Sequence, residues 1–174
     1  MDVNASNLIR VIPDFPKPGI IFKDITPLLA NAEAFRGVCN RIAEYADEVE
    51  YIAGVEARGF IFAAAVAAIR NKGLIPIRKS GKLPGKTYST NYDLEYGKAT
   101  LEVHSNLIPV GGKVLLVDDV LATGGTAVAA LDLIKMAGLS PITMAFLLEI
   151  PALGGRSRIA KSHTGLKIQT ILAE

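Results

Sequence analysis

The stretch "KVLLVDDVLATGGTAV", Lys113 to Val128, carries the clearest signal of the fold. It opens with an apolar run, which is typical of a strand buried on both faces of a parallel sheet. Two adjacent carboxylates, Asp118 and Asp119, follow, and after them comes a turn rich in hydroxyls and glycines. A helix is predicted from residue 125 to 137. A strand that passes through such a turn into a helix predicts an α/β fold with a polar site at the carboxyl end of the strand.

The turn of this stretch has the composition of a phosphate site. Its backbone N–H groups, the hydroxyls of Thr123 and Thr126, and the start of the predicted helix all favour an anion. Carboxylates would repel that anion, but they accept hydrogen bonds, so Asp118 and Asp119 suit the vicinal hydroxyls of a sugar. The stretch therefore predicts a site for a phosphorylated ribose. A turn with an N-capping Asp or Thr explains any two of these residues but not the whole run.

The rest of the chain alternates between strand and helix patterns. This alternation predicts a mostly parallel central sheet with helices on both faces. The helix at residues 58–73 is apolar nearly all round, so we expect the sheet and a partner subunit to cover it. Gly138 is expected just past the end of the helix at residues 125–137. Strands are predicted at residues 51–55, 74–78, 98–104, 113–118, 142–150 and 167–172, and helices at residues 33–49, 58–73 and 125–137.

Length and composition indicate a single globular domain, residues 1–174. The chain is 50% hydrophobic, and its net charge of +2 gives no indication of a nucleic-acid or membrane surface. The one cysteine, Cys39, excludes an internal disulfide and indicates a reducing compartment. The first residues lack the pattern of a signal peptide, and the most apolar run, residues 59–69, is too short to span a bilayer. These features predict a soluble cytoplasmic protein.

Residues 79–97, "KSGKLPGKTYSTNYDLEYG", have no clear periodicity. They contain glycines and a proline but little apolar pattern. A connection of this length in a compact domain usually serves a function or is disordered. We expect a flexible lid loop over an active site, and the alternative is a solvated excursion.

Residues 114–126, "VLLVDDVLATGGT", resemble the 5-phosphoribosyl-1-pyrophosphate (PRPP) motif of type I phosphoribosyltransferases. Other blocks resemble the adenine phosphoribosyltransferases and follow that family's order along nearly the whole chain. These blocks are "IPDFPKPGIIFKDITPLL" (12–29), "YIAGVEARGFIF" (51–62), "IRKSGKLPG" (77–85), "YDLEYGKATLEV" (92–103) and "LLEIPALGGRSRI" (147–159). The resemblance implies the type I fold, with residues 1–30 as a hood that binds the base. It also implies purine salvage, in which adenine and PRPP give AMP and pyrophosphate.

The resemblance implies where PRPP binds. The acids Asp118 and Asp119 would hold the ribose hydroxyls, and Tyr96 would close over the ribose. The 5′-phosphate would lie on a loop made of Ala122, Thr123, Gly124, Gly125 and Thr126. Cations stabilise a leaving pyrophosphate, and the family's motifs supply Arg58, Arg78, Lys79 and Lys82. A cis peptide bond is implied within residues 56–58, and Ala63 stands where many relatives have glycine.

The adenine site is expected in "GIIFKD", residues 19–24. Phe22 offers a ring on which a base can stack. The resemblance implies that backbone groups of Ile21 and Lys23 read the edge of adenine. Glu95 would exchange a proton with the purine ring, so Glu95 and Arg58 are the expected catalytic residues.

The resemblance further implies Mg²⁺ and a homodimer. No cluster of metal-ligating residues is evident in the sequence. Since Mg²⁺ often keeps its waters and binds through substrate phosphates, PRPP or pyrophosphate would hold most of it. His104 and His163 lack companion ligands and are interpreted as structural. Adenine and PRPP are the expected partners, with no nucleic acid and no membrane.

Two other functions stay open at this point. A regulator of the same fold could bind PRPP without catalysis, but it would need a DNA- or RNA-binding surface that the charge does not indicate. A transferase for a 6-oxopurine, xanthine or guanine, is disfavoured only by the likeness at residues 19–24 and 92–97.

Overall fold

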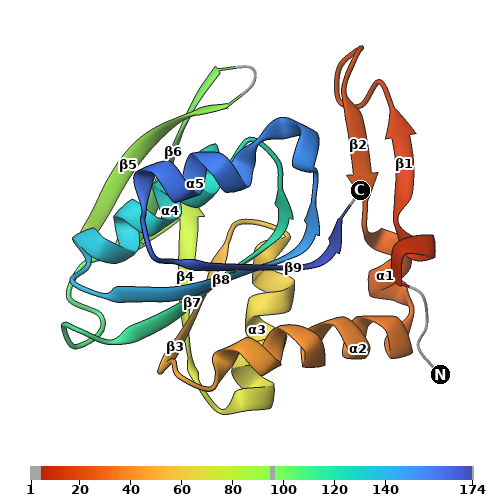
Figure 1. Ribbon diagram of the computed structural model, residues 1–174. Coiled ribbons are helices and arrows are strands. Elements are labelled where there is room, and N and C mark those ends of the chain that lie inside the picture. Colours follow the sequence, from red (N-terminus) through yellow and green to blue (C-terminus); the bar gives the residue numbers. More distant parts are fainter. Residues whose placement is uncertain (1–4, 95–96, 174) are drawn as a thin grey trace. The chain divides into compact units, whose positions relative to one another are not determined.

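The structure, a computed structural model, describes residues 5–94 and 97–173 (Figure 1). The chain forms two compact units, residues 1–41 and residues 42–174. In the described part of the chain, no helix is long and apolar enough to cross a membrane.

The second unit contains a seven-stranded sheet in the order β5-β6-β4-β3-β7-β8-β9. The five strands from β4 to β9 in this order run parallel, and β6 pairs antiparallel with both β4 and β5. The predicted, mostly parallel sheet is therefore confirmed. The strands are β3 (Tyr51–Val55), β4 (Gly73–Lys79), β5 (Thr87–Leu94), β6 (Gly97–His104), β7 (Lys113–Leu121), β8 (Ser140–Glu149) and β9 (Lys167–Ala173).

Helices cover both faces of this sheet, which is why its central strands are apolar along most of their length. On one side lie α4 (Gly125–Met136) and α5 (Gly155–Ser162) (Figure 1). Val114 and Leu116 of β7 point into the core on that side, together with buried residues of α4. Because side chains alternate along a strand, the other face is left for α3 (Gly59–Arg70), which packs against β3 and β7.

The packing of α3 depends on a glycine in β3. A Cβ on Gly54 would lie only 2.6 Å from the Cβ of Ala63. Real Cβ atoms do not approach this closely, so the methyl group of Ala63 fits because residue 54 has no side chain. The departure from glycine at residue 63 is thus accommodated within the packing of α3 on the sheet.

Helix ends differ slightly from the predictions. The helix α3 ends at Arg70, because Asn71 adopts a left-handed conformation with φ of 51°. Gly138 follows α4 with φ of 76°, as predicted. The helix predicted at residues 33–49 is shorter: α2 (Ala32–Ala43) passes into a 3₁₀ turn, η2 (Glu44–Ala46).

The predicted lid at residues 79–97 is not one continuous loop. Its second half contains β5, which pairs with β6 from Thr87↔His104 to Leu94↔Gly97. The strand was missed because its inward face carries tyrosines, Tyr88 and Tyr92, among polar residues, so the alternation that marks a half-buried strand is weak in the sequence, although both tyrosines pack against the core. Backbone pairing with β6 provides order that the side-chain pattern did not indicate.

The first unit consists of short elements. Its two strands, β1 (Arg10–Pro13) and β2 (Ile21–Asp24), form an antiparallel ribbon in which Ile12 faces Phe22. The remaining elements are a 3₁₀ turn η1 (Ala5–Leu8), α1 (Thr26–Ala30) and most of α2. A second 3₁₀ turn of the larger unit, η3 (Pro151–Leu153), connects β8 to α5.

Candidate active site

The paired acids lie within β7 and not after it. The strand was predicted to end at residue 118, but it continues to pair with β8 as far as Leu121↔Glu149. On its other side, pairing with β3 ends at Val117. Asp118 and Asp119 therefore still lie past the carboxyl end of a neighbouring parallel strand, which is where ligands bind in such sheets.

The surroundings of the two acids oppose their full ionisation. Asp119 is 7% exposed, and its Oδ2 lies 2.7 Å from Nε of Arg58. Burial raises the pKa of Asp118 well above its usual range, and the charge of Asp119 raises it further. Burial also raises the pKa of Asp119, although the Arg58 guanidinium opposes this. The pair is thus poised for a ligand that brings hydrogen-bond donors or positive charge.

Arg58 reaches the acids because α3 begins close to β7. A Cβ on Gly59 would lie 2.7 Å from Oδ1 of Asp118 and 3.0 Å from the carbonyl oxygen of Val117. Only a glycine fits at the start of this helix. The peptide bond between Glu56 and Ala57 is cis, as the resemblance implied.

The loop after β7 forms the N-terminus of α4. Gly124 is the N-cap residue and has φ of 78°, which favours glycine. No side chain caps this end of the helix within the described residues. Thr123 and Thr126 are half-buried beside it. Amides without a capping side chain, together with the helix dipole, make this loop suitable for a phosphate.

Glu56 organises the cationic residues, and sequence analysis gave it no role. Its carboxylate accepts hydrogen bonds from Arg78 Nε at 3.2 Å and from the backbone N–H of Lys79 at 2.9 Å. Arg78 also donates to the carbonyl oxygen of Lys82 at 2.9 Å. Burial acts to raise the pKa of Glu56, but these bonds outweigh it and the net shift is downward. The side chains of Lys79 and Lys82 are exposed.

The segment predicted to bind the base lies in the first unit. Ile21 is 61% exposed, and Phe22 packs edge-on against Phe15 with ring centroids 5.1 Å apart. Lys23 lies opposite Val11. In a two-stranded ribbon each strand leaves one row of backbone groups unpaired within the sheet, so β2 can offer backbone donors and acceptors to a ligand.

Asp24 anchors the end of this strand. It accepts hydrogen bonds from the Thr26 hydroxyl at 2.6 Å, the Thr26 N–H at 2.9 Å and Nη2 of Arg10 at 2.6 Å. The bond from the Thr26 hydroxyl is the largest of the effects that lower the pKa of Asp24 to about 2. The carboxylate is therefore ionised at neutral pH and links both strands to the start of α1.

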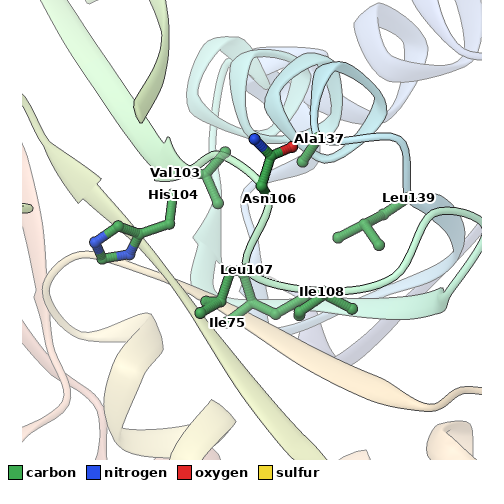
Figure 2. A pocket seen from close by; sticks show the side chains of 8 residues that line it. All are labelled: Ile75, Val103, His104, Asn106, Leu107, Ile108, Ala137 and Leu139. Atoms are coloured by element: carbon green, nitrogen blue, oxygen red, sulfur yellow. The ribbon is translucent and has the colours of Figure 1, made fainter. Parts of the chain in front are cut away.

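A small pocket of the second unit lies away from the acids of β7 and the loop that follows them. Figure 2 shows its lining side chains, which come from the start of β4, the end of β6, the β6–β7 connection and the end of α4. Its volume of about 240 Å³ includes open solvent and is below the roughly 300–1,000 Å³ typical of ligand pockets. Ile75 lies near the amino-terminal end of β4 and Leu139 directly precedes β8, so the pocket is at the sheet edge opposite the acids.

Two comparisons identify the family. The phosphoribosyl transferase domain matches residues 25–171. The adenine phosphoribosyltransferase of Thermobifida fusca (strain YX) is 51% identical over 166 residues, which cover 92% of this chain and 94% of the relative. The chain belongs to the adenine phosphoribosyltransferase family.

Solved structures of adenine phosphoribosyltransferases share the fold. The enzyme of Rhodothermus marinus DSM 4252 superposes with a TM-score of 0.90 at 41% identity, over 98% of this chain and 96% of that one. The enzyme of Giardia lamblia, solved in complex with 9-deazaadenine, has a TM-score of 0.92 at 36% identity over the same shares. The type I phosphoribosyltransferase fold and the membership of a transferase family, both predicted from sequence, are confirmed.

The structure brings some of the predicted residues of the adenine phosphoribosyltransferase site together. Arg58 forms an ion pair with Asp119, and the Arg78 side chain donates a hydrogen bond to the backbone carbonyl oxygen of Lys82. Glu95 and Tyr96 lie outside the described residues, so their roles stay predictions. Glu56 was missed because a carboxylate in a cationic motif has no obvious ligand. Its position two residues before Arg58, in "EAR", was the one available signal.

Proposed function

We propose that this chain transfers the 5-phosphoribosyl group of PRPP to adenine and forms AMP and pyrophosphate. The observation that carries the proposal is the sequence of groups along β7 and α4. Two acids, with the Arg58 guanidinium beside one of them, are followed by the N-terminal turn of α4, for which the described part of the chain provides no capping side chain. Ribose hydroxyls and a 5′-phosphate need these groups in this order. The adenine phosphoribosyltransferases that resemble the chain along nearly its whole length supply the identity of the base.

In the proposed reaction the bond between C1′ and the pyrophosphate oxygen breaks as a ring nitrogen of adenine bonds to C1′. Positive charge develops on the ribose ring, and Asp118 and Asp119 would stabilise it while they accept hydrogen bonds from the hydroxyls. Negative charge develops on the leaving group, which Arg58, Arg78 and the two lysines Lys79 and Lys82 would bind. The amides and hydroxyls of Ala122 to Thr126 would hold the 5′-phosphate in place.

The base would bind at Ile21, Phe22 and Lys23. Phe22 would stack on the purine, and backbone groups of the other two residues would read its edge. Glu95 would take the proton that adenine loses on bonding to C1′ and return it in the reverse reaction. Tyr96 would cover the ribose, and the β5–β6 region would exclude water during the reaction.

The proposed reaction uses Mg²⁺. No group of three or more His, Cys, Asp or Glu side chains capable of holding a metal occurs in the described residues. Asp118 and Asp119 provide carboxylate oxygens, which suits an ion held by one or two carboxylates together with substrate phosphates and water. When bound, the ion would offset the charge on the pyrophosphate.

The deciding experiment is an assay of PRPP-dependent AMP formation, with hypoxanthine and guanine as competitors. We expect AMP and pyrophosphate in equal amounts and weak competition by both oxopurines. A regulator would bind PRPP without forming AMP. A 6-oxopurine transferase would consume hypoxanthine or guanine in preference to adenine, and either result would overturn the proposal.

We also propose that the enzyme is a cytoplasmic homodimer. On α3, Ile61 and Ile69 are 39% and 48% exposed, so this apolar helix retains an uncovered face that a second copy could bury. Cys39 is a free, buried thiol, as expected for a reducing compartment. Light scattering after size exclusion should give twice the mass of 18.5 kDa, and a monomer at all concentrations would contradict the assembly.

A further inference from the structure

The loop proposed to bind the 5′-phosphate rests directly on the backbone of α5. A Cβ on Gly124 would lie 2.7 Å from the carbonyl oxygen of Gly155. In the opposite direction, a Cβ on Gly155 would overlap the carbonyl oxygen of Ala122 and lie 3.0 Å from the amide nitrogen of Gly124. The two backbones therefore lie against each other, and the Leu121 side chain is also only 2.8 Å from the position of a Cβ on Gly155. A shift of Gly155 toward the loop would press on the backbone of Ala122 and Gly124.

The next residue along the chain, Arg156, is held by three hydrogen bonds. Its Nε and Nη2 donate to the two carboxylate oxygens of Glu149 at 3.0 and 2.5 Å, and its Nη1 donates to the carbonyl oxygen of Ile168 at 2.9 Å. Such two-point pairing fixes orientation as well as distance. The first turn of α5 is thus attached to β8 and to β9.

Only the carboxylate of this ion pair is buried, because the Arg156 side chain is 43% exposed. Glu149 is 7% exposed and ends β8, opposite Leu121 of β7. Exposed pairs contribute little because water screens them, whereas a buried carboxylate that loses its partner is costly. The Arg156 hydrogen bond is the main reason that the pKa of Glu149 lies below its usual value. Both carboxylate oxygens are bound to Arg156, so Glu149 is occupied as an anchor.

A backbone bond completes the connection. The N–H of Ile150 donates to the carbonyl oxygen of Leu121 at 2.9 Å, one residue before the phosphate loop starts. The chain from Glu149 to Arg156 therefore leaves β8 beside the loop, turns through η3, and returns to touch the loop at Gly155.

We propose that Glu149 and Arg156 are positioning residues for the 5′-phosphate: their ion pair holds Gly155 against Ala122 and Gly124 and so sets the spacing of the phosphate-binding amides. The inference rests on the proposed function of this loop. Neither residue touches the substrate. Gly155 packs directly against Ala122 and Gly124. Without the ion pair Gly155 can move, and the loop then departs from the geometry that a phosphate requires.

The test compares four variants of the whole enzyme. Arg156→Ala removes the ion pair. Arg156→Lys keeps the positive charge but cannot form the two parallel hydrogen bonds to Glu149, and Glu149→Gln keeps the shape of the side chain without its charge. Arg158→Ala removes an exposed arginine from the same helix and is the matched control. For each variant we would measure kcat, KM for PRPP, the thermal midpoint, and the calorimetric Kd for ribose 5-phosphate and for pyrophosphate.

We expect Arg156→Ala to raise KM for PRPP and Kd for ribose 5-phosphate by about 10-fold to 10²-fold, a range typical of small misplacements of binding groups. Pyrophosphate should bind as in the wild type, because Arg58 and Arg78 lie elsewhere on the sheet edge. Arg156→Lys and Glu149→Gln should give intermediate losses, and Arg158→Ala none. A loss of affinity for ribose 5-phosphate but not for pyrophosphate distinguishes a positioning role from a general loss of stability.

Unchanged ribose 5-phosphate affinity in folded Arg156→Ala would overturn the proposal, and so would equal losses for ribose 5-phosphate and pyrophosphate. If Arg156→Ala fails to fold, the same comparison in Glu149→Gln and Arg156→Lys decides. Absence of AMP formation by the wild type would instead defeat the proposed function, while the calorimetric comparison would still test the positioning of the loop.

Discussion

Asp118 lies against the start of α3: a Cβ on Gly59 would be only 2.7 Å from Oδ1 of Asp118. Asp119 is the next residue along the strand. Burial and the neighbouring acid raise the pKa of Asp118 well above the usual range. We predict that Asp118→Asn stabilises the ligand-free protein at pH 8, since the amide keeps the shape of the side chain without a charge to bury. The same change should lower kcat/KM for PRPP, because a charged acceptor for a ribose hydroxyl is lost.

The pH dependence checks the cause. A carboxyl group whose pKa is raised by folding destabilises the protein as pH rises above its unfolded value of about 3.9, until the folded pKa is passed. The advantage of Asp118→Asn in thermal unfolding should therefore shrink between pH 8 and pH 5. An advantage that stays constant with pH would show that the charge is not its source.

Glu56 is the residue most clearly revealed by the structure alone. We predict that Glu56→Gln raises Kd for pyrophosphate by about 10-fold, since a hydrogen bond to a charged group contributes roughly 1.5–3 kcal/mol and Arg78 would lose its fixed orientation. Glu102→Gln is the matched control, because Glu102 binds Ser80 Oγ and the N–H of Gly81 in the same turn. Equal effects of both substitutions would mean that only overall charge matters.

The chemistry of the site could be predicted where one short stretch holds all the groups. The acids and the phosphate loop are consecutive, so their roles followed from residue types and order. The contact between Glu56 and Arg78 depends on β3 lying beside β4, and that between Glu149 and Arg156 depends on the path of the turn η3 between β8 and α5. Local sequence does not carry that information. Side chains that support a site are therefore found less easily than those that bind the ligand.

Among the elements, buried strands were the most predictable. The strand β3 and residues 114–117 of β7 are continuous apolar runs because helices cover both faces of the sheet. The edge strand β5 was missed because only its tyrosines, Tyr88 and Tyr92, pack against the core, while pairing with β6 involves backbone groups that leave no mark in the sequence. The ribbon β1–β2 was not predicted either, since four-residue strands give too little pattern.

Glu95 and Tyr96 separate β5 from β6 in the sequence. If this region delivers the general base, Glu95→Gln should lower the single-turnover rate of AMP formation by about 10²–10⁴-fold with PRPP affinity nearly intact. The matched measurement is PRPP binding by calorimetry in the same variant. A rate like that of the wild type, or a loss seen only in affinity, would remove Glu95 from proton transfer.

The ends of α4 and α5 meet at a buried histidine. Nδ1 of His163 lies 2.8 Å from Nζ of Lys135, and its Nε2 lies 3.1 Å from Oδ1 of Asp132. Burial is the main reason that the pKa of His163 is lowered, and Lys135 lowers it further while Asp132 opposes. The neutral ring is therefore the form that suits the fold.

This lowered pKa predicts a pH dependence of stability. The contribution of His163 to the free energy of unfolding is complete above about pH 6.5, the approximate pKa of a histidine in the unfolded chain. It is lost as the pH falls from there through the pKa of His163 in the folded protein, because the unfolded chain binds the proton more tightly. Unfolding by urea at pH 8 and pH 5.5 should show a smaller loss of stability in His163→Gln than in the wild type. His104→Gln serves as control, and an unchanged pH dependence in His163→Gln would contradict the assignment.

On the scale of the whole molecule, the residues proposed to bind the base and those proposed to bind the phosphate belong to different compact units. Ile21, Phe22 and Lys23 belong to residues 1–41, whereas the acids and the phosphate loop belong to residues 42–174. AMP carries a base and a phosphate, but ribose 5-phosphate carries no base. We predict that ribose 5-phosphate slows amide hydrogen exchange at residues 115–128 alone, and that AMP slows it there and at residues 19–24 as well.

The physical reason is that a ligand protects the amides of the elements it binds, by an amount that grows with its concentration relative to Kd. At 100 times Kd this stabilisation is about 2.7 kcal/mol, which is easily measured by exchange. Pyrophosphate is the control, since it should protect residues near Arg58 and Arg78 and leave residues 19–24 unchanged. If AMP at saturating concentration protects only residues 115–128, then adenine is not bound by the first unit, and the assignment of Phe22 and its neighbours must be abandoned.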